Sequence, residues 1–227
     1  MGVYARSYGV PLFFEDLAKV VRENGGRNRA NAANFANDAT VDAAGNIYVT
    51  NSFSPVIYRI TPEYQVSEFL RSQRFAGDGF QLNGIDAFRG PDGEQVLIVA
   101  NSTQGTLTRI PLADPAAMQT VQLPGDAKLF SADGVTRITD GELVVIANSP
   151  VQAQGEGEDV PPTAYFLRSD DHWLSARITR RELRDWQFPT TADLRGGQVY
   201  ALSAKLNILF GGSGERVPRY EIYNLSR

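Results

Sequence analysis

The 227-residue chain contains no cysteine and only one histidine, His172. The absence of cysteine excludes disulfides, zinc–thiolate sites and cysteine nucleophiles. A single histidine rules out a His–His dyad and gives little support to a Ser-His-Asp triad. His172 also stands in an Asp-Asp-His-Trp stretch that is typical of an exposed loop. The chemistry of this chain must therefore be sought among other residue types.

Basic charge and long apolar runs are also scarce. The chain has 22 Lys and Arg against 26 Asp and Glu, a net charge of −4. We therefore expect no nucleic-acid partner, because phosphate binding requires a basic surface. We also expect no membrane span, since no segment approaches roughly 18 apolar residues. Residues 1–22 do not resemble a secretory signal peptide, so the compartment stays open: cytoplasmic by default, secreted if a leader precedes Met1.

What the chain does contain is an internal repeat. Each unit begins with a short strand that carries a polar residue, turns at or near glycine, and continues into an apolar β-rich run. The polar residues that start the four units are Asn37, Asn83, Asp133 and Thr190, at spacings of 46, 50 and 57 residues. This strand–turn–strand pattern is typical of β-hairpins. Two more strands follow in most units, and four strands at a period near 50 residues indicate propeller blades rather than solenoid coils.

The sequence therefore predicts an all-β fold, a β-propeller of four-stranded antiparallel blades with about four blades plus a partial one. We expect a single domain over residues 1–227, consisting of a partial blade with its connector and then four blades, at 1–33, 34–75, 76–125, 126–187 and 188–227. The third blade carries an acidic Gly- and Pro-rich loop at 149–162. A stack of short helices, the main rival, lacks the required 3.6-residue periodicity. One helical turn is expected from the spacing of Phe14, Leu17, Val20 and Val21.

The repeat implies an incomplete six-bladed ring. One period before Asn37 lies ahead of Met1, so Val3-Tyr4 and residues 11–14 are expected to be outer strands of a blade without inner strands. An open ring leaves unpaired strand edges that can pair with another chain. We therefore expect either a truncated gene product or an unusual closure, and the open edges would allow oligomerisation.

The polar residues that start the units are the candidate site. Inner strands line the channel of a propeller, so residues 37, 83, 133 and 190 should meet at one rim. Converging oxygen atoms suit a hard cation such as calcium, which takes 6–8 oxygen ligands, and they equally suit ordered water or a hydroxyl-rich ligand. Asn, Asp and Gly also recur in turns for conformational reasons. We favour the turn interpretation for the Asn-Ser pairs at 51, 101 and 148, and a site for the rim set, because turn chemistry would not fix a shared register.

The register of Phe35-Ala-Asn37-Asp38, Leu82-Asn83-Gly84 and Ala132-Asp133-Gly134 resembles the senescence-marker-protein (regucalcin)/gluconolactonase group of six-bladed propellers, over about residues 34–207. The resemblance implies a divalent metal on the channel axis, usually calcium with zinc or manganese as alternatives, and hydrolysis of lactones or related esters. It makes Asn83 and Asp133 metal ligands and places Asn37 near metal and substrate. The remaining ligand of the family is a glutamate on the first blade, which this chain lacks. Because calcium affinity depends on ligand charge, that departure should weaken metal binding.

These inferences assign a role to each candidate residue. Asp133 and Asn37 are the expected catalytic residues, and Asn83 and Asp133 the expected metal ligands. Asn37, Thr190 and Thr191 are expected to bind a lactone or ester substrate. The alternative function is a non-catalytic propeller that binds a partner through its loops, or a truncated relic. Trp173 and Trp186 are expected to pack between blades.

Overall fold

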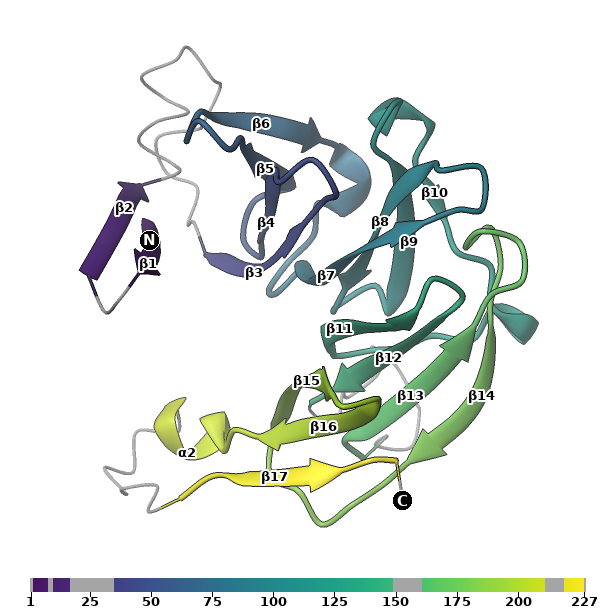
Figure 1. Cartoon of the computed structure of the whole chain (residues 1–227). Helices are drawn as coiled ribbons and strands as arrows, with labels where there is room; N and C mark the ends of the chain where they lie inside the picture. Colours follow the sequence, from purple (N-terminus) through teal and green to yellow (C-terminus); the bar gives the residue numbers. More distant parts are fainter. Residues whose placement is uncertain (1, 8–9, 17–34, 149–160, 211–218, 227) are drawn as a thin grey trace.

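The computed structural model describes residues 2–7, 10–16, 35–148, 161–210 and 219–226, with side chains from residue 35 onward except at 209–210. Its strands form one hairpin and four antiparallel sheets that follow one another around a common axis (Figure 1). The hairpin pairs β1 (Gly2–Ser7) with β2 (Val10–Asp16). The two segments expected to be outer strands of a partial blade therefore pair with each other.

The four sheets are built from consecutive strands of the chain. The first sheet contains β3 (Ala36–Val41), β4 (Ile47–Asn51), β5 (Val56–Ile60) and β6 (Val66–Arg71). The second contains β7 (Leu82–Arg89), β8 (Gln95–Asn101), β9 (Thr106–Pro111) and β10 (Gln119–Thr120). The third contains β11 (Ala132–Thr139), β12 (Glu142–Ala147), β13 (Thr163–Arg168) and β14 (Arg177–Glu182). The fourth contains β15 (Pro189–Arg195), β16 (Gln198–Ser203) and β17 (Glu221–Asn224).

Helical structure is confined to short connectors in the described residues. They are η1 (Gln73–Phe75), η2 (Pro115–Ala117), η3 (Pro124–Asp126) and α2 (Leu206–Phe210), the last between β16 and β17. None of these helices has the length and apolarity that crossing a membrane would require. Of the residues expected to form a helical turn, Phe14 lies in strand β2 and the other three lie outside the described residues. Most of the acidic loop, 149–160, also lies outside them.

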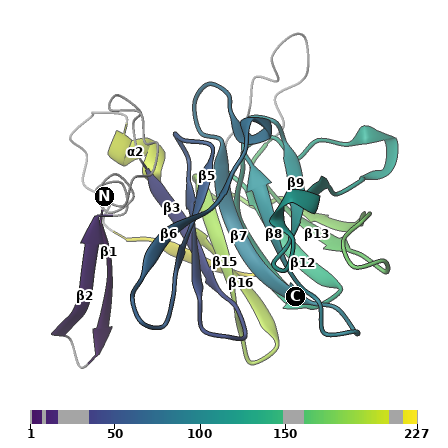
Figure 2. The same cartoon turned by 90° about the horizontal axis from the view of Figure 1, so that it is seen from above.

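The arrangement is that of a four-bladed portion of a β-propeller, so the predicted fold class is confirmed. Each sheet begins at an inner strand, and neighbouring inner strands β3, β7, β11 and β15 contact one another in succession. In the view turned by 90°, the strands of the four sheets run between the same two ends of the molecule (Figure 2). The fourth sheet differs from the prediction, because it has three strands rather than four in the part of the chain described here.

Packing between sheets explains why the second strands are nearly continuous apolar runs. A strand buried on both faces has no solvent side, so apolar residues need not alternate with polar ones. Leu97, Ile98 and Val99 of β8 are all fully buried. Their side chains contribute to two different cores, one shared with the first sheet and one shared with the third. Burial of this kind contributes about 25 cal/mol per Å² of apolar surface.

The two tryptophans pack between neighbouring sheets, as predicted. Trp173 is 1% exposed, and its ring lies 5.0 Å from the ring of Phe88 in the second sheet. Trp186 belongs to the core shared by the third and fourth sheets, where it contacts Tyr223 with 5.8 Å between ring centroids. Each indole therefore joins two blades.

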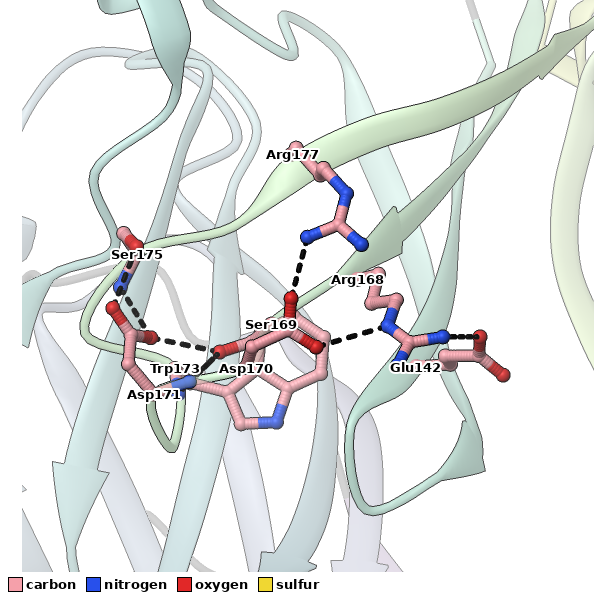
Figure 3. Close-up of polar contacts among 8 residues, drawn as sticks. All are labelled: Glu142, Arg168, Ser169, Asp170, Asp171, Trp173, Ser175 and Arg177. Atoms are coloured by element: carbon pink, nitrogen blue, oxygen red, sulfur yellow. Dashed lines mark hydrogen bonds and ion pairs between the residues drawn. The ribbon is translucent and has the colours of Figure 1, made fainter.

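The β13–β14 connection that carries Trp173 is held by its own polar contacts (Figure 3). Asp171 accepts hydrogen bonds from the backbone N–H and the hydroxyl of Ser175, at 2.9 and 2.6 Å. The Ser169 hydroxyl accepts the N–H of Trp173 at 2.8 Å. His172 is partly buried in this turn rather than fully exposed. Both His172 and Trp173 have a positive φ, at 58° and 66°, a conformation that persists only where surrounding contacts enforce it.

Candidate functional site

The four candidate rim positions all lie in β-bulges. In each inner strand, two residues stand opposite a single residue of the second strand. The shifts fall between Ala36 and Ala39, Leu82 and Ile85, Ala132 and Val135, and Pro189 and Ala192. The bulged pairs are therefore 37–38, 83–84, 133–134 and 190–191. Bulges redirect side chains and are common beside functional sites, so the shared register reflects a repeated backbone feature.

Consecutive bulges lie in direct contact. A Cβ added to Gly84 would lie 2.1 Å from the carbonyl oxygen of Asp133 and 2.4 Å from the nitrogen of Val135. A Cβ added to Gly134 would lie 2.7 Å from the Cα of Thr191. Only glycine fits such close approaches of two backbones. The second, third and fourth bulges therefore touch in sequence.

The first bulge is joined to the second by a carboxylate. Asp38 Oδ2 accepts the backbone N–H of Ile85 at 3.1 Å, and Asp38 Oδ1 accepts the N–H of Ala39 at 2.8 Å. The hydroxyl of Thr50 also donates to the carbonyl of Asn83 at 2.7 Å. The structure thus brings the bulges that carry Asn37, Asn83 and Asp133 next to one another.

In the first three blades, the residue that follows the second strand holds the rim side chain of its own blade. The amide of Asn37 donates to the Ser52 hydroxyl at 2.8 Å, and that of Asn83 donates to the Ser102 hydroxyl at 3.0 Å. In the third blade the amide of Asn148 donates to Asp133 Oδ2 at 2.5 Å. The repeat therefore supplies each of these rim residues with a partner of matching chemistry.

This pattern adds a second role to the Asn-Ser pairs. Asn51 and Asn101 act as turn residues, as expected, since their Oδ1 atoms accept the N–H groups of Phe53 and Gln104. Ser52 and Ser102 also lie in turns, but their hydroxyls, like the amide of Asn148, hydrogen-bond the rim side chains. Aligning the repeats so that Asn148 matches Asn51 and Asn101 shifts the third blade by one residue from its structural register. Ala147 pairs with Ala132 as Asn51 pairs with Ala36, which puts Asn148 in the place of Ser52.

The two serine hydroxyls also bridge blades. Ser52 donates to the carbonyl of Leu82 at 2.7 Å, and Ser102 donates to the carbonyl of Ala132. Both serines are buried. Replacing either with alanine is expected to lower the free energy of unfolding by about 1–3 kcal/mol, because two buried polar groups lose their partner.

Urea denaturation would measure this loss as a lower midpoint with an unchanged m-value. Ser67→Ala is the matched control, because in the described part of the chain the Ser67 hydroxyl makes no side-chain hydrogen bond. That control should stay within about 0.5 kcal/mol of the wild type. A similarly small effect for Ser52→Ala would contradict the bridging role.

The rim contains acceptor atoms with too few donors. Asn83 is 5% exposed, yet its Oδ1 accepts no hydrogen bond from any described residue. Burial raises the pKa of Asp133 to about 7, and the Asp38 charge adds to this rise, while the amides of Asn148 and Asn83 act against it. Burial also raises the pKa of Asp38. Hydrogen bonds therefore compensate the charged forms of both carboxyl groups only in part.

An oxygen-rich site short of positive charge fits a hard cation. Asn83 and Asp133 are the residues that could hold it, with Asn37 and Asp38 beside them, because calcium and similar ions bind carboxylate and amide oxygens. The described residues contain no group of three or more Asp, Glu, His or Cys that could ligate a metal. Asp38 and Asp133 together supply a formal charge of −2 when both are ionised.

Asp38 is the site residue that sequence reasoning missed. Its coupling to Asp133 places a second carboxylate at the rim. The signal was present in the repeat, since the equivalent second bulge positions are Gly84 and Gly134 whereas the first blade has an aspartate there.

The two threonines occupy the fourth bulge. Thr190 is partly buried, and Thr191 is exposed with its hydroxyl 3.3 Å from the carbonyl of Ala192. A hollow of about 480 Å³ on the outward face of the fourth sheet includes Thr191 together with Tyr200 and Ile222. The Thr191 hydroxyl donates to the carbonyl of Ala192, and the role of both threonines in substrate binding stays a prediction.

No family model matches the chain, and no curated protein matches it by sequence. Among solved structures, a candidate gluconolactonase is similar at TM-score 0.53 and 16% identity, covering 78% of this chain and 61% of that one. A protein of unknown function from Bacteroides caccae gives 0.51 and 11%, covering 96% and 62%. Regucalcin from Agrobacterium tumefaciens, a calcium-binding protein, gives 0.50 and 14%, covering 74% and 52%.

These likenesses identify the class of protein: the chain is a β-propeller similar in fold to a candidate gluconolactonase and to a regucalcin. At identities of 16% and below they show the fold alone. The chain spans less than two thirds of the length of each of these three structures.

Proposed function

We propose that the chain is a metal-dependent hydrolase of the gluconolactonase type that acts on lactones or related esters at the rim. The observation that carries this proposal is the unsatisfied, buried Oδ1 of Asn83 beside the carboxyl group of Asp133, whose pKa is raised to about 7. Calcium is the cation that best matches these oxygen donors, with zinc and manganese as alternatives. The similarity in fold to a candidate gluconolactonase and a calcium-binding regucalcin supports the same function.

Each rim residue has a different role in the proposed ester hydrolysis. Asn83 and Asp133 would hold the cation, which supplies Lewis acidity towards the ester carbonyl. Asp133 would accept the proton of the water that adds to the carbonyl carbon, and would return it to the leaving alkoxide oxygen as the ester C–O bond breaks, so that the ring opens to a hydroxy acid. Asn37, fixed by Ser52, orients the carbonyl group. The hydroxyls of Thr190 and Thr191 donate hydrogen bonds to the substrate.

A non-catalytic binding protein is the second candidate function. It is favoured by the small ligand charge at the rim, because a cation held by two carboxylates and neutral amides binds less tightly than one held by more carboxylates. In this case the rim would bind a ligand without converting it.

Hydrolysis of a panel of lactones separates the two functions. Acid release would be followed by pH titration after chelation and readdition of calcium, zinc or manganese. We expect turnover by the wild type and a fall in kcat/KM of about 100-fold or more for Asp133→Asn, because both a ligand and a proton acceptor are altered. Asp193→Asn is the matched control, since this exposed carboxylate on β15 accepts its neighbour's N–H at 2.7 Å. Absence of turnover with all three metals would favour the binding protein.

A further inference from the structure

Three phenylalanine rings meet beside the rim of the first two sheets. Phe35 precedes β3, Phe53 follows β4 and Phe80 precedes β7, so all three lie at the end of the sheets where the inner strands begin. The ring centroids of Phe35 lie 5.6 Å from those of both Phe53 and Phe80, and the latter two are 4.8 Å apart. Phe53 is 38% exposed and Phe80 is 44% exposed. Single exposed apolar residues are common, but a contiguous aromatic patch marks an interaction site.

The aromatic cluster is held by backbone hydrogen bonds. The N–H groups of Phe35 and Phe53 both donate to Asn51 Oδ1, each at 3.1 Å. The carbonyl of Phe80 accepts the hydroxyl of Thr103 at 2.8 Å. The rings therefore start from fixed backbone positions, which lowers the entropic cost of binding a ligand on them.

The same hydrogen bonds tie the cluster to the candidate site. Ser52, the residue before Phe53, holds the side chain of Asn37 and accepts the N–H of Gln81, the residue after Phe80, at 2.9 Å. Phe35 is two residues from Asn37 and Phe80 is three residues from Asn83. At about 3.3 Å per residue of extended chain, the aromatic cluster lies within roughly 10 Å of the rim along the backbone.

We propose that Phe35, Phe53 and Phe80 form a platform that binds an apolar, aryl-bearing substituent of the substrate. The inference rests on the proposed lactone chemistry at the rim. An ester group placed at Asn83 and Asp133 would extend its substituent over the neighbouring surface, and on the side of the first two sheets that surface is aromatic. Ring edges and faces at these separations favour stacking with a further aromatic group. The chain should therefore prefer aryl-substituted lactones over unsubstituted or polyhydroxylated ones.

Binding of non-hydrolysable lactams tests the platform separately from catalysis. The probes are 6-phenylpiperidin-2-one and unsubstituted piperidin-2-one, with affinities measured by calorimetry in the presence of calcium. We expect the phenyl-bearing lactam to bind on the order of tenfold more tightly, as expected for stacking and burial of one aromatic ring. The double variant Phe53→Ala/Phe80→Ala should lose that preference while keeping its affinity for the unsubstituted lactam. Leu183→Ala is the control, because Leu183 is similarly exposed, at 55%, on another blade.

The possible outcomes distinguish the platform from the function on which it rests. Equal affinity of the wild type for the two lactams would overturn the platform and leave the rim proposal intact. A preference for the phenyl-bearing lactam that survives in the double variant would also overturn it. If neither lactam binds, the proposed lactone chemistry fails, and the platform fails with it. Thermal melting of each variant verifies that it is folded before affinities are compared.

Discussion

Replacing Gly84 with alanine is expected to lower the free energy of unfolding by about 3 kcal/mol or more, the largest loss of stability anticipated for a single methyl group in this chain. The added Cβ would lie 2.1 Å from the carbonyl oxygen of Asp133. The backbones of Gly84 and Asp133 are fixed in neighbouring sheets. Relief would require the second and third blades to move apart. Because their shared core includes Phe88 and Trp173, that movement would also disturb packing.

Urea denaturation with intrinsic fluorescence as the signal would measure the loss, since Trp173 lies in the affected interface. Gly134→Ala should behave in the same way, because its Cβ would lie 2.7 Å from the Cα of Thr191. The control is Gly125→Ala, where nothing lies within 4 Å and only the positive φ of 63° opposes the change. That substitution should cost about 1 kcal/mol. Equal effects at positions 84 and 125 would show that close approach of the bulges is not the cause.

The repeat made the fold predictable from sequence. Apolar runs such as Val96–Ala100 and Leu143–Ala147 have to be buried on both faces, and their regular spacing allows them to stack only as neighbouring sheets. The first positions of the bulges were aligned from residue type alone, because Asn37, Asn83 and Asp133 each lie at the same register near the start of an inner strand. The comparison of repeated units thus predicted the fold and the register of the bulges, which no single segment would have indicated.

What the sequence did not predict depends on which residues the fold brings into contact. Asn148 binds Asp133 because the third blade places it one residue away from the position its letters suggest. Asp38 belongs to the rim because its carboxylate reaches the backbone of the next blade at Ile85. Helix α2 had no recognisable periodicity, since five residues make little more than one turn. For Asn148 and Asp38, the deciding partner lies in another segment of the chain.

The bulges and the electrostatics of the rim have one structural origin. Each bulge interrupts an inner strand where it approaches its neighbour, so polar groups are turned towards a region that the sheets shield from water. Asn83 Oδ1 and the carboxyl group of Asp133 share this environment, one without a donor and the other with a pKa raised to about 7. The same geometry that requires glycine at 84 and 134 therefore creates the oxygen-rich environment in which we propose that a cation binds.

In the absence of metal, Asp133→Asn is expected to stabilise the protein at pH 8 and to have little effect near pH 4. The folded-state pKa of Asp133, about 7, lies above its ordinary value of 3.8 because of burial and the charge of Asp38. Folding therefore favours the protonated form, so the contribution of Asp133 is most favourable below pH 4 and is lost as the pH rises towards 7. At pH 8 the wild type retains a poorly compensated charge, whose removal should add about 1–3 kcal/mol.

Calcium should reverse that order, because a cation compensates the charge of Asp133 only in the folded state. The melting temperature of the wild type at pH 8 should rise with calcium, by an amount equivalent to about 2.7 kcal/mol at a hundredfold excess over Kd. Asp133→Asn should show little response, whereas the control Asp193→Asn should respond like the wild type. The measurement is a set of melting curves at pH 4, 6 and 8 with calcium or chelator. If the melting temperatures of the wild type and Asp133→Asn changed with pH in parallel, Asp133 would have an ordinary pKa. The rim would then contain no destabilising charge for a cation to compensate.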